Sequence, residues 1–352
     1  MFQLVCAVFV SRAVAQRNAA EKTVPEDVKE DGPLLAPLTS TPTAPADNPT
    51  TKAKAFLGKQ LFFDPRLSGD NTISCASCHI PGKAYGDGIA LARGQQDQLL
   101  TRNTQSCLNV GFYPSLFWDG RAASLEQQAL IPIQSPREMN QELVEIEQEL
   151  ARIPGYVRQF KKAFGSAPDR DGIAKALAAY QRTLVTGPSA YDRFLMGDEE
   201  ALSKEAKQGL ELFQGDAGCI ECHHGPLLSD NKYYRLRLSG DLGRALITGD
   251  EDDRYRFRTP SLRNVAETGP YMHDGSLQSL DDVVTFYYRE IPSSRRNGLL
   301  PDTQALTGQS FSEIPLIVAF LKSLTGTVPE FIPPQLPVGR QGLLKEETSG
   351  VP

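Results

Sequence analysis

Two copies of the motif Cys-x-x-Cys-His, at 75–79 and 219–223, constrain this chain more than any other feature. The spacing suits covalent attachment of a c-type haem, because two thiols can add to the porphyrin vinyl groups while the next residue offers an imidazole to the iron. A redox dithiol or part of a zinc site would also use such a pair, but two pairs 144 positions apart offer no obvious zinc ligand set. We therefore predict two covalently bound haem c groups, held by Cys75, Cys78 and His79 and by Cys219, Cys222 and His223.

The first 15 residues resemble a short secretory signal peptide. An apolar run ends in Ala13-Val14-Ala15, a small-x-small cleavage pattern, although a basic start is missing. The run is too short to span a bilayer, so we expect no stable membrane span. Covalent haem c attachment independently indicates the bacterial periplasm. The net charge of −6 gives no support for nucleic-acid binding.

Composition and spacing divide the rest of the 352 residues into four parts. Residues 16–50 are rich in Pro and Thr and should form an extended or disordered leader, with order beginning near Lys52. Residues 51–190 and 200–335 are predicted to be an N-terminal and a C-terminal haem c domain, since the chain is long enough for two ordinary cores. Residues 336–352 belong to a Pro-rich tail that either straps back over the surface or stays loose.

The two predicted domains show matched spacing. The pattern Ala-x-x-Gly-x-x-Leu-Phe precedes both haem motifs, at 55–62 and 206–213, and predicts an amphipathic helix in each case. Each domain also closes on a predicted helix, 173–185 and 314–324, which should end at a glycine suited to a helix C-terminus, Gly187 and Gly326. Strand alternation is scarce. We therefore predict an all-α fold of two cytochrome c-like haem domains related by internal duplication.

The chain has four histidines, namely His79, His223, His224 and His273. His224 directly follows a motif histidine and cannot easily reach the opposite face of the same haem, so we interpret it as a surface or propionate-side residue. One imidazole therefore remains for two distal positions. Methionine can also bind haem iron, and the chain has Met139, Met196 and Met272, but methionine more often packs in a core. A haem without a strong sixth ligand suits peroxide or dioxygen chemistry, whereas a six-coordinate haem suits electron transfer. The residues alone favour an enzyme but leave a non-enzymatic di-haem electron carrier open.

Longer motifs accompany the two haem motifs: LGKQLFFDPRLS at 57–68, FWDGR at 117–121, RTPSLRN at 258–264 and YMHDG at 271–275. With them the sequence resembles the bacterial di-haem cytochrome c peroxidase and MauG family over roughly residues 50–335. The resemblance implies a peroxide site on the first haem, within the N-terminal domain, and an electron-handling role for the second haem.

The family's peroxide site has a Gln, a Pro four residues later and a Glu six residues further, and Gln128, Pro132 and Glu138 have this spacing. Cleavage of the O–O bond needs proton transfer, so the resemblance implies Glu138 as general acid/base and Gln128 as its hydrogen-bonding partner. Trp118, the single tryptophan, matches the family's indole between the haems and is implied as an electron relay. The family's Ca²⁺ site between the domains implies the ligands Asn103, Thr268 and Pro270.

Departures from the family pattern bear on the subfamily. The loop 82–117 contains no His, whereas reductively activated peroxidases place a distal His there, so the first haem should be open without prior reduction. Fourteen positions after His273, where cytochrome c peroxidases have a Met ligand to the second haem, stands Tyr287, which resembles MauG; Tyr288 is the alternative if the register is shifted. A phenolate ligand would lower the reduction potential relative to a thioether. MauG has a surface Trp where this chain has Ala217, which weakens a MauG-type role.

The leading hypothesis is a periplasmic di-haem c peroxidase that reduces hydrogen peroxide to water with electrons from a small cytochrome c or a cupredoxin. The alternatives are MauG-type oxidation of a protein partner, which matures a quinone cofactor, and a non-enzymatic electron carrier. Cys107 has no assigned role and is interpreted as a buried free thiol.

Overall fold

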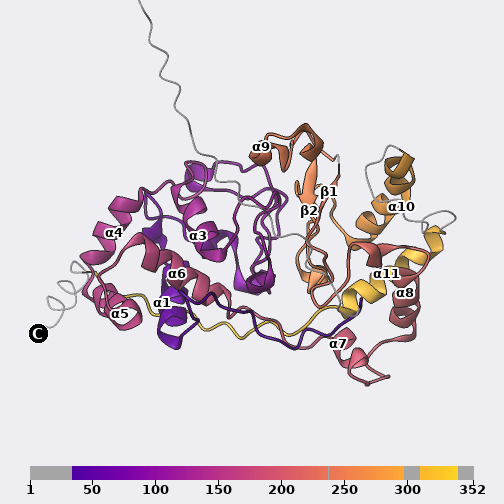
Figure 1. Cartoon of the computed structure of the whole chain (residues 1–352), viewed down its shortest axis with the longest axis horizontal. Helices are drawn as coiled ribbons and strands as arrows, with labels where there is room; N and C mark the ends of the chain where they lie inside the picture. The colour runs from indigo at the N-terminus through magenta and orange to yellow at the C-terminus, as the bar shows by residue number, and fades with distance from the viewer. Residues whose placement is uncertain (1–33, 237, 297–309, 340–352) are drawn as a thin grey trace, which may run out of the picture. The chain divides into compact units, whose positions relative to one another are not determined.

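The computed structural model describes residues 34–236, 238–296 and 310–339. The predicted signal peptide, the start of the leader and residues 340–352 of the tail lie outside the described residues. The first half contains α1 (Lys52–Phe62), α2 (Cys75–Cys78), α3 (Leu125–Gln134), α4 (Leu143–Ala151), α5 (Pro154–Phe164) and α6 (Arg170–Gln181). The second half contains α7 (Ala190–Leu195), α8 (Lys204–Gln214), α9 (Ala245–Thr248), α10 (Leu280–Arg296) and α11 (Ile314–Ser323) (Figure 1). None of the helices in these ranges is both long and apolar enough to cross a membrane.

The fold is mostly helical, as predicted, but it also contains a small β-ribbon. Strands β1 (Tyr233–Arg235) and β2 (Arg256–Arg258) pair antiparallel, with Tyr233 opposite Arg258 and α9 in the connection between them. The prediction of an all-α fold was wrong in this detail. Strands of three residues are too short to show an alternating pattern in the sequence.

Each half packs its first long helix against its last. Helix α1 lies against α6, and α8 lies against α11. A Cβ atom on Gly58 would lie 1.8 Å from the carbonyl oxygen of Ala176, and one on Gly209 would lie 2.0 Å from that of Leu316. Both crossings bring two backbones into direct contact and therefore require glycine. This requirement explains the glycine of the Ala-x-x-Gly pattern that the two halves share.

The predicted glycines do not end the closing helices. Helix α6 ends at Gln181 and α11 at Ser323, several residues before Gly187 and Gly326. The two glycines instead meet each other. The N–H of Gly187 donates to the carbonyl of Thr327 at 2.8 Å, and a Cβ atom on Gly326 would lie 2.1 Å from the carbonyl oxygen of Gly187. They allow two extended segments to cross closely. The glycines are therefore required by a tertiary contact and not by the end of a helix.

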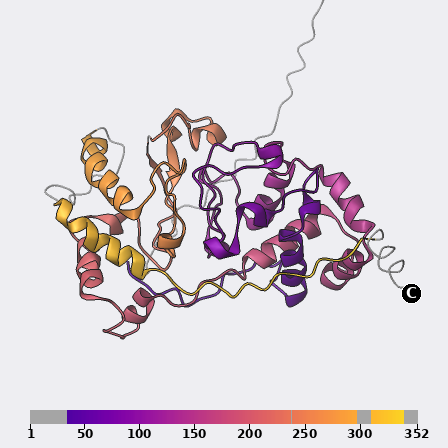
Figure 2. The same ribbon diagram turned by 180° about the vertical axis from the view of Figure 1, so that it is seen from behind.

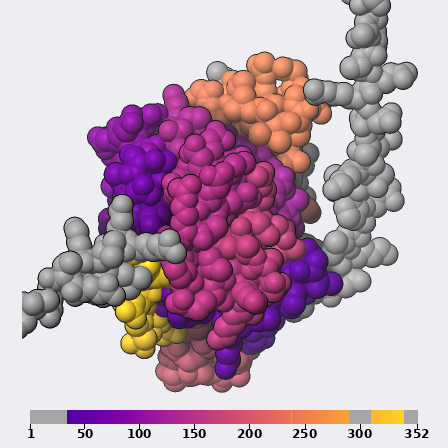
Figure 3. Space-filling model, turned by 90° about the vertical axis from the view of Figure 1, so that its left-hand side faces the viewer, coloured from indigo at the N-terminus to yellow at the C-terminus, as the bar shows by residue number. Residues whose placement is uncertain are grey.

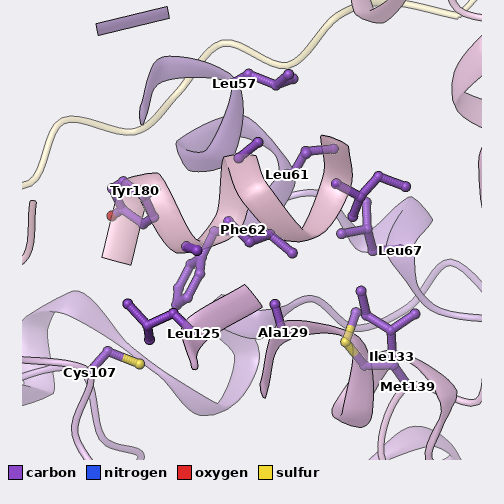
Figure 4. Packing of buried hydrophobic residues seen from close by; sticks show 14 of the residues in the cluster. Leu57, Leu61, Phe62, Leu67, Cys107, Leu125, Ala129, Ile133, Met139 and Tyr180 are labelled. Atoms are coloured by element: carbon purple, nitrogen blue, oxygen red, sulfur yellow. The ribbon is translucent and has the colours of Figure 1, made fainter. Parts of the chain in front are cut away.

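The buried apolar residues form two clusters, one in each half. Figure 4 shows part of the first cluster, where side chains from α1, α3 and α6 pack together and Cys107 lies at one side (Leu61, Phe62, Ala129, Ile133, Tyr180). Cys107 is buried, as predicted, and burial raises the pKa of its thiol. A buried, protonated thiol of this kind is unreactive.

Residues 34–50, here called the N-terminal strap, are extended and packed, which corrects the prediction that order begins near Lys52. The N–H of Leu38 donates to Asp192 Oδ1 in the second half at 3.0 Å. Asn48 Nδ2 donates to Glu126 Oε1 in the first half at 2.7 Å. Since Leu38 and Asn48 are both buried, the N-terminal strap ties the two halves together.

Residues 327–339, the C-terminal strap, run from the second half back to the first. Phe331 stacks on Phe63 with 4.8 Å between ring centroids, and the carbonyl of Gln335 accepts a hydrogen bond from Gln60 Nε2 at 2.5 Å. In Figures 1 and 2 both straps can be followed between the halves, and Figure 3 shows the yellow C-terminal strap against the first half. For the residues described, the tail therefore straps back over the surface.

Candidate haem and peroxide sites

Both haem motifs open into one cavity of about 1190 Å³. Its walls include Cys75, Cys78 and His79 of the first motif and Cys219, Cys222 and His223 of the second. A pocket for a single small ligand or cofactor has a volume of roughly 300–1,000 Å³. The larger volume and the two separate ligand sets fit two haem groups.

The two motif histidines have the same geometry. His79 Nδ1 lies 3.0 Å from the carbonyl oxygen of Tyr85, and His223 Nδ1 lies 2.9 Å from that of Leu228. A carbonyl can only accept, so Nδ1 carries the proton and Nε2 keeps its lone pair for a metal ion. Burial lowers the pKa of both imidazoles, which favours this neutral form. Each ring is therefore prepared to bind an iron.

The motif backbone gathers the thiols beside these rings. The N–H of His79 donates to the carbonyl of Cys75 and the N–H of His223 to that of Cys219, both at 2.9 Å. These turns bring both thiols and the imidazole of each motif to the cavity wall, as covalent haem attachment requires. All four thiols are free, and burial raises the pKa of Cys75 and Cys219 to about 12. The residues present fit two haem c groups.

Gln128, Pro132 and Glu138 line the cavity together beside the first haem motif. Gln128 and Pro132 belong to α3, and Glu138 follows in the next loop. Burial, and to a smaller extent the negative charge of Glu138, raises the pKa of the thiols of Cys75 and Cys78, which reflects how near the carboxylate lies to that motif. The structure thus brings the three predicted peroxide-site residues into one group.

The backbone of Glu138 holds its side chain at the cavity wall. The carbonyl of Glu138 accepts from the N–H of Gln95 at 2.9 Å, and its own N–H donates to the carbonyl of Ser135 at 3.0 Å. Within the part of the chain that the structure describes, the carboxylate has no hydrogen bond or ion pair. It is therefore available for proton transfer to a ligand in the cavity.

Helix α10 begins in the second half as α3 does in the first. Ser124 and Ser279 precede the two helices and cap them through their hydroxyl groups, and each helix follows a loop closed by an antiparallel bridge. Pro132 and Tyr287 are both the eighth residue of their helix, and both line the cavity. Tyr287 therefore occupies the position beside the second haem motif that Pro132 occupies beside the first.

Of two adjacent tyrosines, Tyr287 is the one with a hydroxyl that has no partner among the described residues. Burial, with smaller contributions from Cys222 and Cys219, raises the pKa of its phenol. Tyr288 also borders the cavity, but it packs in the second core and its hydroxyl donates to Glu313 Oε2 at 3.4 Å. The geometry agrees with Tyr287 as the predicted ligand, and ligation itself stays a prediction.

Trp118 lies where the two halves meet. Its indole N–H donates to the carbonyl of Asn103 at 3.0 Å. The N–H of Asn103 donates in turn to the carbonyl of His273 at 2.8 Å, and the carbonyl of Trp118 accepts from the N–H of Arg258 at 2.8 Å. Trp118 also borders the cavity that both haem motifs share. This position suits the predicted relay.

His273 is the one histidine that the sequence analysis left as a candidate for a distal haem site. In the structure its ring makes other contacts. Its ring stacks on Phe257 with 3.7 Å between centroids, and its Nε2 lies 3.1 Å from Ser239 Oγ. Burial lowers the pKa of this imidazole. His273 is thus held as a neutral packing residue at the junction of the two halves.

The three predicted calcium ligands border the same cavity. The side-chain amide of Asn103 donates to the carbonyls of Ile89 and Ala90 at 2.9 and 3.2 Å, which leaves its Oδ1 to accept. In the described ranges no three or more His, Cys, Asp or Glu side chains come together as a metal site. A cation here would depend on amide and backbone oxygens, including those of Thr268 and Pro270, and calcium accepts such ligands.

Sequence reasoning assigned no role to the arginines of the cavity wall. Arg102 joins the halves, since its Nη1 lies 2.5 Å from Asp119 Oδ2 and its Nε 2.6 Å from Asp241 Oδ2. Arg258 is only 2% exposed. Arg258 begins the motif RTPSLRN and Arg102 directly precedes Asn103. The partners of both arginines follow from contacts between distant segments, for which the sequence carries no signal.

Known proteins are similar to this chain in sequence and in structure. Residues 52–200 match the family model described as di-haem cytochrome c peroxidase. The cytochrome-c peroxidase IdrP1 of Pseudomonas sp. (strain SCT) is 38% identical over 333 residues, which cover 84% of this chain and 87% of that protein. The chain belongs to the di-haem cytochrome c peroxidase family. Membership confirms the predicted family, the haem cofactors and the peroxidase class of oxidoreductase.

The chain is also similar to proteins that carry the name MauG. The methylamine utilization protein MauG of Methylorubrum extorquens is 40% identical over 299 residues, covering 83% of this chain and 84% of that protein. The crystal structure of a MauG-like protein associated with microbial copper homeostasis has a TM-score of 0.73 and 31% identity, covering 83% of this chain and 95% of that chain. The family therefore includes both subfamilies that the sequence suggested.

Proposed function

We propose that this family member is a periplasmic enzyme that reduces hydrogen peroxide to water with electrons from a small cytochrome c or a cupredoxin. The observation that carries the proposal is the meeting of Gln128 and Glu138 on the cavity wall beside the motif of His79. A bound haem supplies the iron at which peroxide is reduced.

The roles of the surrounding residues follow from their chemistry. Reduction of peroxide needs a proton to leave one oxygen and another to reach the departing one, which a carboxylate can mediate. Glu138 carries out this transfer, and the amide of Gln128 orients the ligand through a hydrogen bond. The side chain of Pro132 has no atom that can bind iron, so the first site stays open, whereas Tyr287 offers a phenol oxygen at the corresponding position. Trp118 passes electrons between the two sites.

Steady-state assays test this proposal. The holo-protein is expected to consume hydrogen peroxide with a reduced small cytochrome c or cupredoxin as the donor. Electron paramagnetic resonance of the ferric protein should show one high-spin and one low-spin haem, because one site is open and the other has a sixth ligand. Two low-spin signals that cyanide does not change, together with no binding of carbon monoxide to the reduced protein, would overturn the proposal in favour of an electron carrier.

Oxidation of a protein partner, as in MauG, is a second candidate that Tyr287 favours. The residue takes the place of the methionine expected in cytochrome c peroxidases. Against this candidate, Ala217 is 3% exposed and has no oxidisable side chain to carry electrons to a partner surface. Negligible peroxide turnover, together with oxidation of a protein substrate by peroxide, would select this second function.

We also propose that Asn103, Thr268 and Pro270 bind one Ca²⁺ ion between the halves. Their oxygens are hard donors, which calcium prefers. Removal of calcium with a chelator is expected to lower peroxide turnover, and added Ca²⁺ should restore it, because the site lies beside Trp118. Calorimetric titration of the chelated protein should show one binding event. Titration without heat of binding and unchanged turnover would contradict this site.

We further propose that the two halves arose by internal duplication. Asn109 and Asn264, 155 positions apart, have φ angles of 59° and 56°. Asn109 Oδ1 accepts from the N–H of Thr186 at 3.0 Å, and Asn264 Oδ1 accepts from that of Gly326 at 3.3 Å. The same separation relates Trp118 to His273 and Pro132 to Tyr287. Superposed halves of an experimental structure should pair these residues, and any other pairing would contradict a simple duplication.

A further inference from the structure

Arg258, at the end of β2, is a buried cation without an anionic partner among the described residues. Its side chain is 2% exposed and borders the cavity. Nη1 donates to Asn231 Oδ1 at 3.0 Å and to the carbonyl of Thr259 at 3.3 Å, and the guanidinium lies 4.3 Å from the ring centroid of Tyr113. All of these partners are neutral. Burial lowers the pKa of Arg258, and within the described part of the chain no carboxylate offsets this effect.

The other arginines on the cavity wall differ in this respect. Arg102, Arg121 and Arg263 each have a carboxylate within 3.0 Å, and Arg137 is exposed to solvent. Several buried side-chain nitrogens and oxygens lack a partner in the described chain, and among them Arg258 Nε is the one on the cavity wall. A buried ionised group without a partner is strongly unfavourable, so an anion from outside the chain should complete this site.

We propose that the guanidinium of Arg258 binds a propionate carboxylate of one of the two haems. The proposal rests on the proposed function only in that both haems occupy the cavity. The Nε of Arg258 has no partner in the described chain. A planar guanidinium can bind a carboxylate through two parallel hydrogen bonds, one from Nε and one from a terminal nitrogen. Arg258 also donates its backbone N–H to Trp118, so the haem that it binds is fixed relative to the indole.

The substitution Arg258→Gln tests this contact through reduction potentials. The spectroscopically resolved potential of one haem is expected to fall, because the guanidinium charge that stabilises the reduced form is lost. The haem whose potential falls is the one whose propionate Arg258 binds. Arg258→Lys keeps the charge and should retain most of the wild-type potential. Arg182→Gln is the matched control, since Arg182 is also buried with an unpartnered nitrogen but lies outside the cavity wall.

Two results would overturn the proposal. The first is an Arg258→Gln protein with both haems attached and both potentials unchanged. The second, which does not depend on a variant that folds, is a crystal structure of the wild-type holo-protein in which the guanidinium nitrogens lie beyond about 4 Å from every propionate oxygen. Peroxide turnover and haem content of the wild type are measured in parallel. A wild-type protein that holds both haems but does not turn over peroxide would contradict the proposed function and leave the contact of Arg258 with a propionate untouched.

Discussion

Substitution of Glu138 by Gln is expected to lower the rate of peroxide reduction by about 10²–10⁴-fold, the usual contribution of a positioned general acid/base. The amide fills the same space as the carboxylate but cannot take up and return a proton. Because proton transfer precedes electron delivery, the loss should be equal with a protein donor and with a small artificial donor. Stopped-flow measurement of peroxide consumption by the holo-protein, with both kinds of donor, gives the result.

The matched control is Glu142→Gln. Glu142 lies on the same loop but is exposed and outside the cavity wall, so this variant should keep the wild-type rate. A Glu138→Gln protein with both haems attached and a rate within a few-fold of wild type would show that the proton is carried by another group. A loss seen with the protein donor alone would instead indicate a role in electron delivery.

Local patterns gave correct predictions where the structure itself is local. The haem motifs and the amphipathic helices α1 and α8 each depend on the spacing of nearby residues. The N-terminal strap and the crossing of Gly187 with Gly326 were missed, and the course of the tail was left open between two alternatives, because all three depend on contacts between segments far apart in the chain. A glycine after a helix and a glycine at a chain crossing look the same in a sequence.

The candidate site could be predicted from the sequence only in part, for a similar reason. Gln128 and Glu138 were found through family resemblance, since each alone would be an ordinary polar residue. The correspondence of Pro132 with Tyr287 stayed hidden because the haem motifs are 144 positions apart, whereas these two residues are 155 positions apart. The β-ribbon and α9, which lie between the second motif and α10, account for the longer separation. The need of Arg258 for an anion became visible only when its burial and its neutral partners were known.

Replacement of Tyr287 by Met is expected to raise the reduction potential of the second haem by on the order of hundreds of millivolts, since axial ligands set haem potentials over about 0.8 V. A phenolate carries a negative charge that stabilises the oxidised iron, whereas a neutral thioether favours the reduced form. Potentiometric titration followed by absorption spectroscopy measures the change. The potential of the first haem should move far less, because Pro132 at the corresponding position offers no ligand.

Two further variants separate ligation from packing. Tyr287→Phe removes the oxygen and should convert the low-spin signal of the second haem to high spin. Tyr288→Phe removes the long 3.4 Å hydrogen bond to Glu313 and should leave both spin states unchanged. Its cost in the free energy of unfolding should be about 1 kcal/mol or less. If Tyr288→Phe changed the spin state and Tyr287→Phe did not, the register would be shifted by one residue. The second haem would then take its ligand from the core face of α10, and the correspondence between Tyr287 and Pro132 would have no functional meaning.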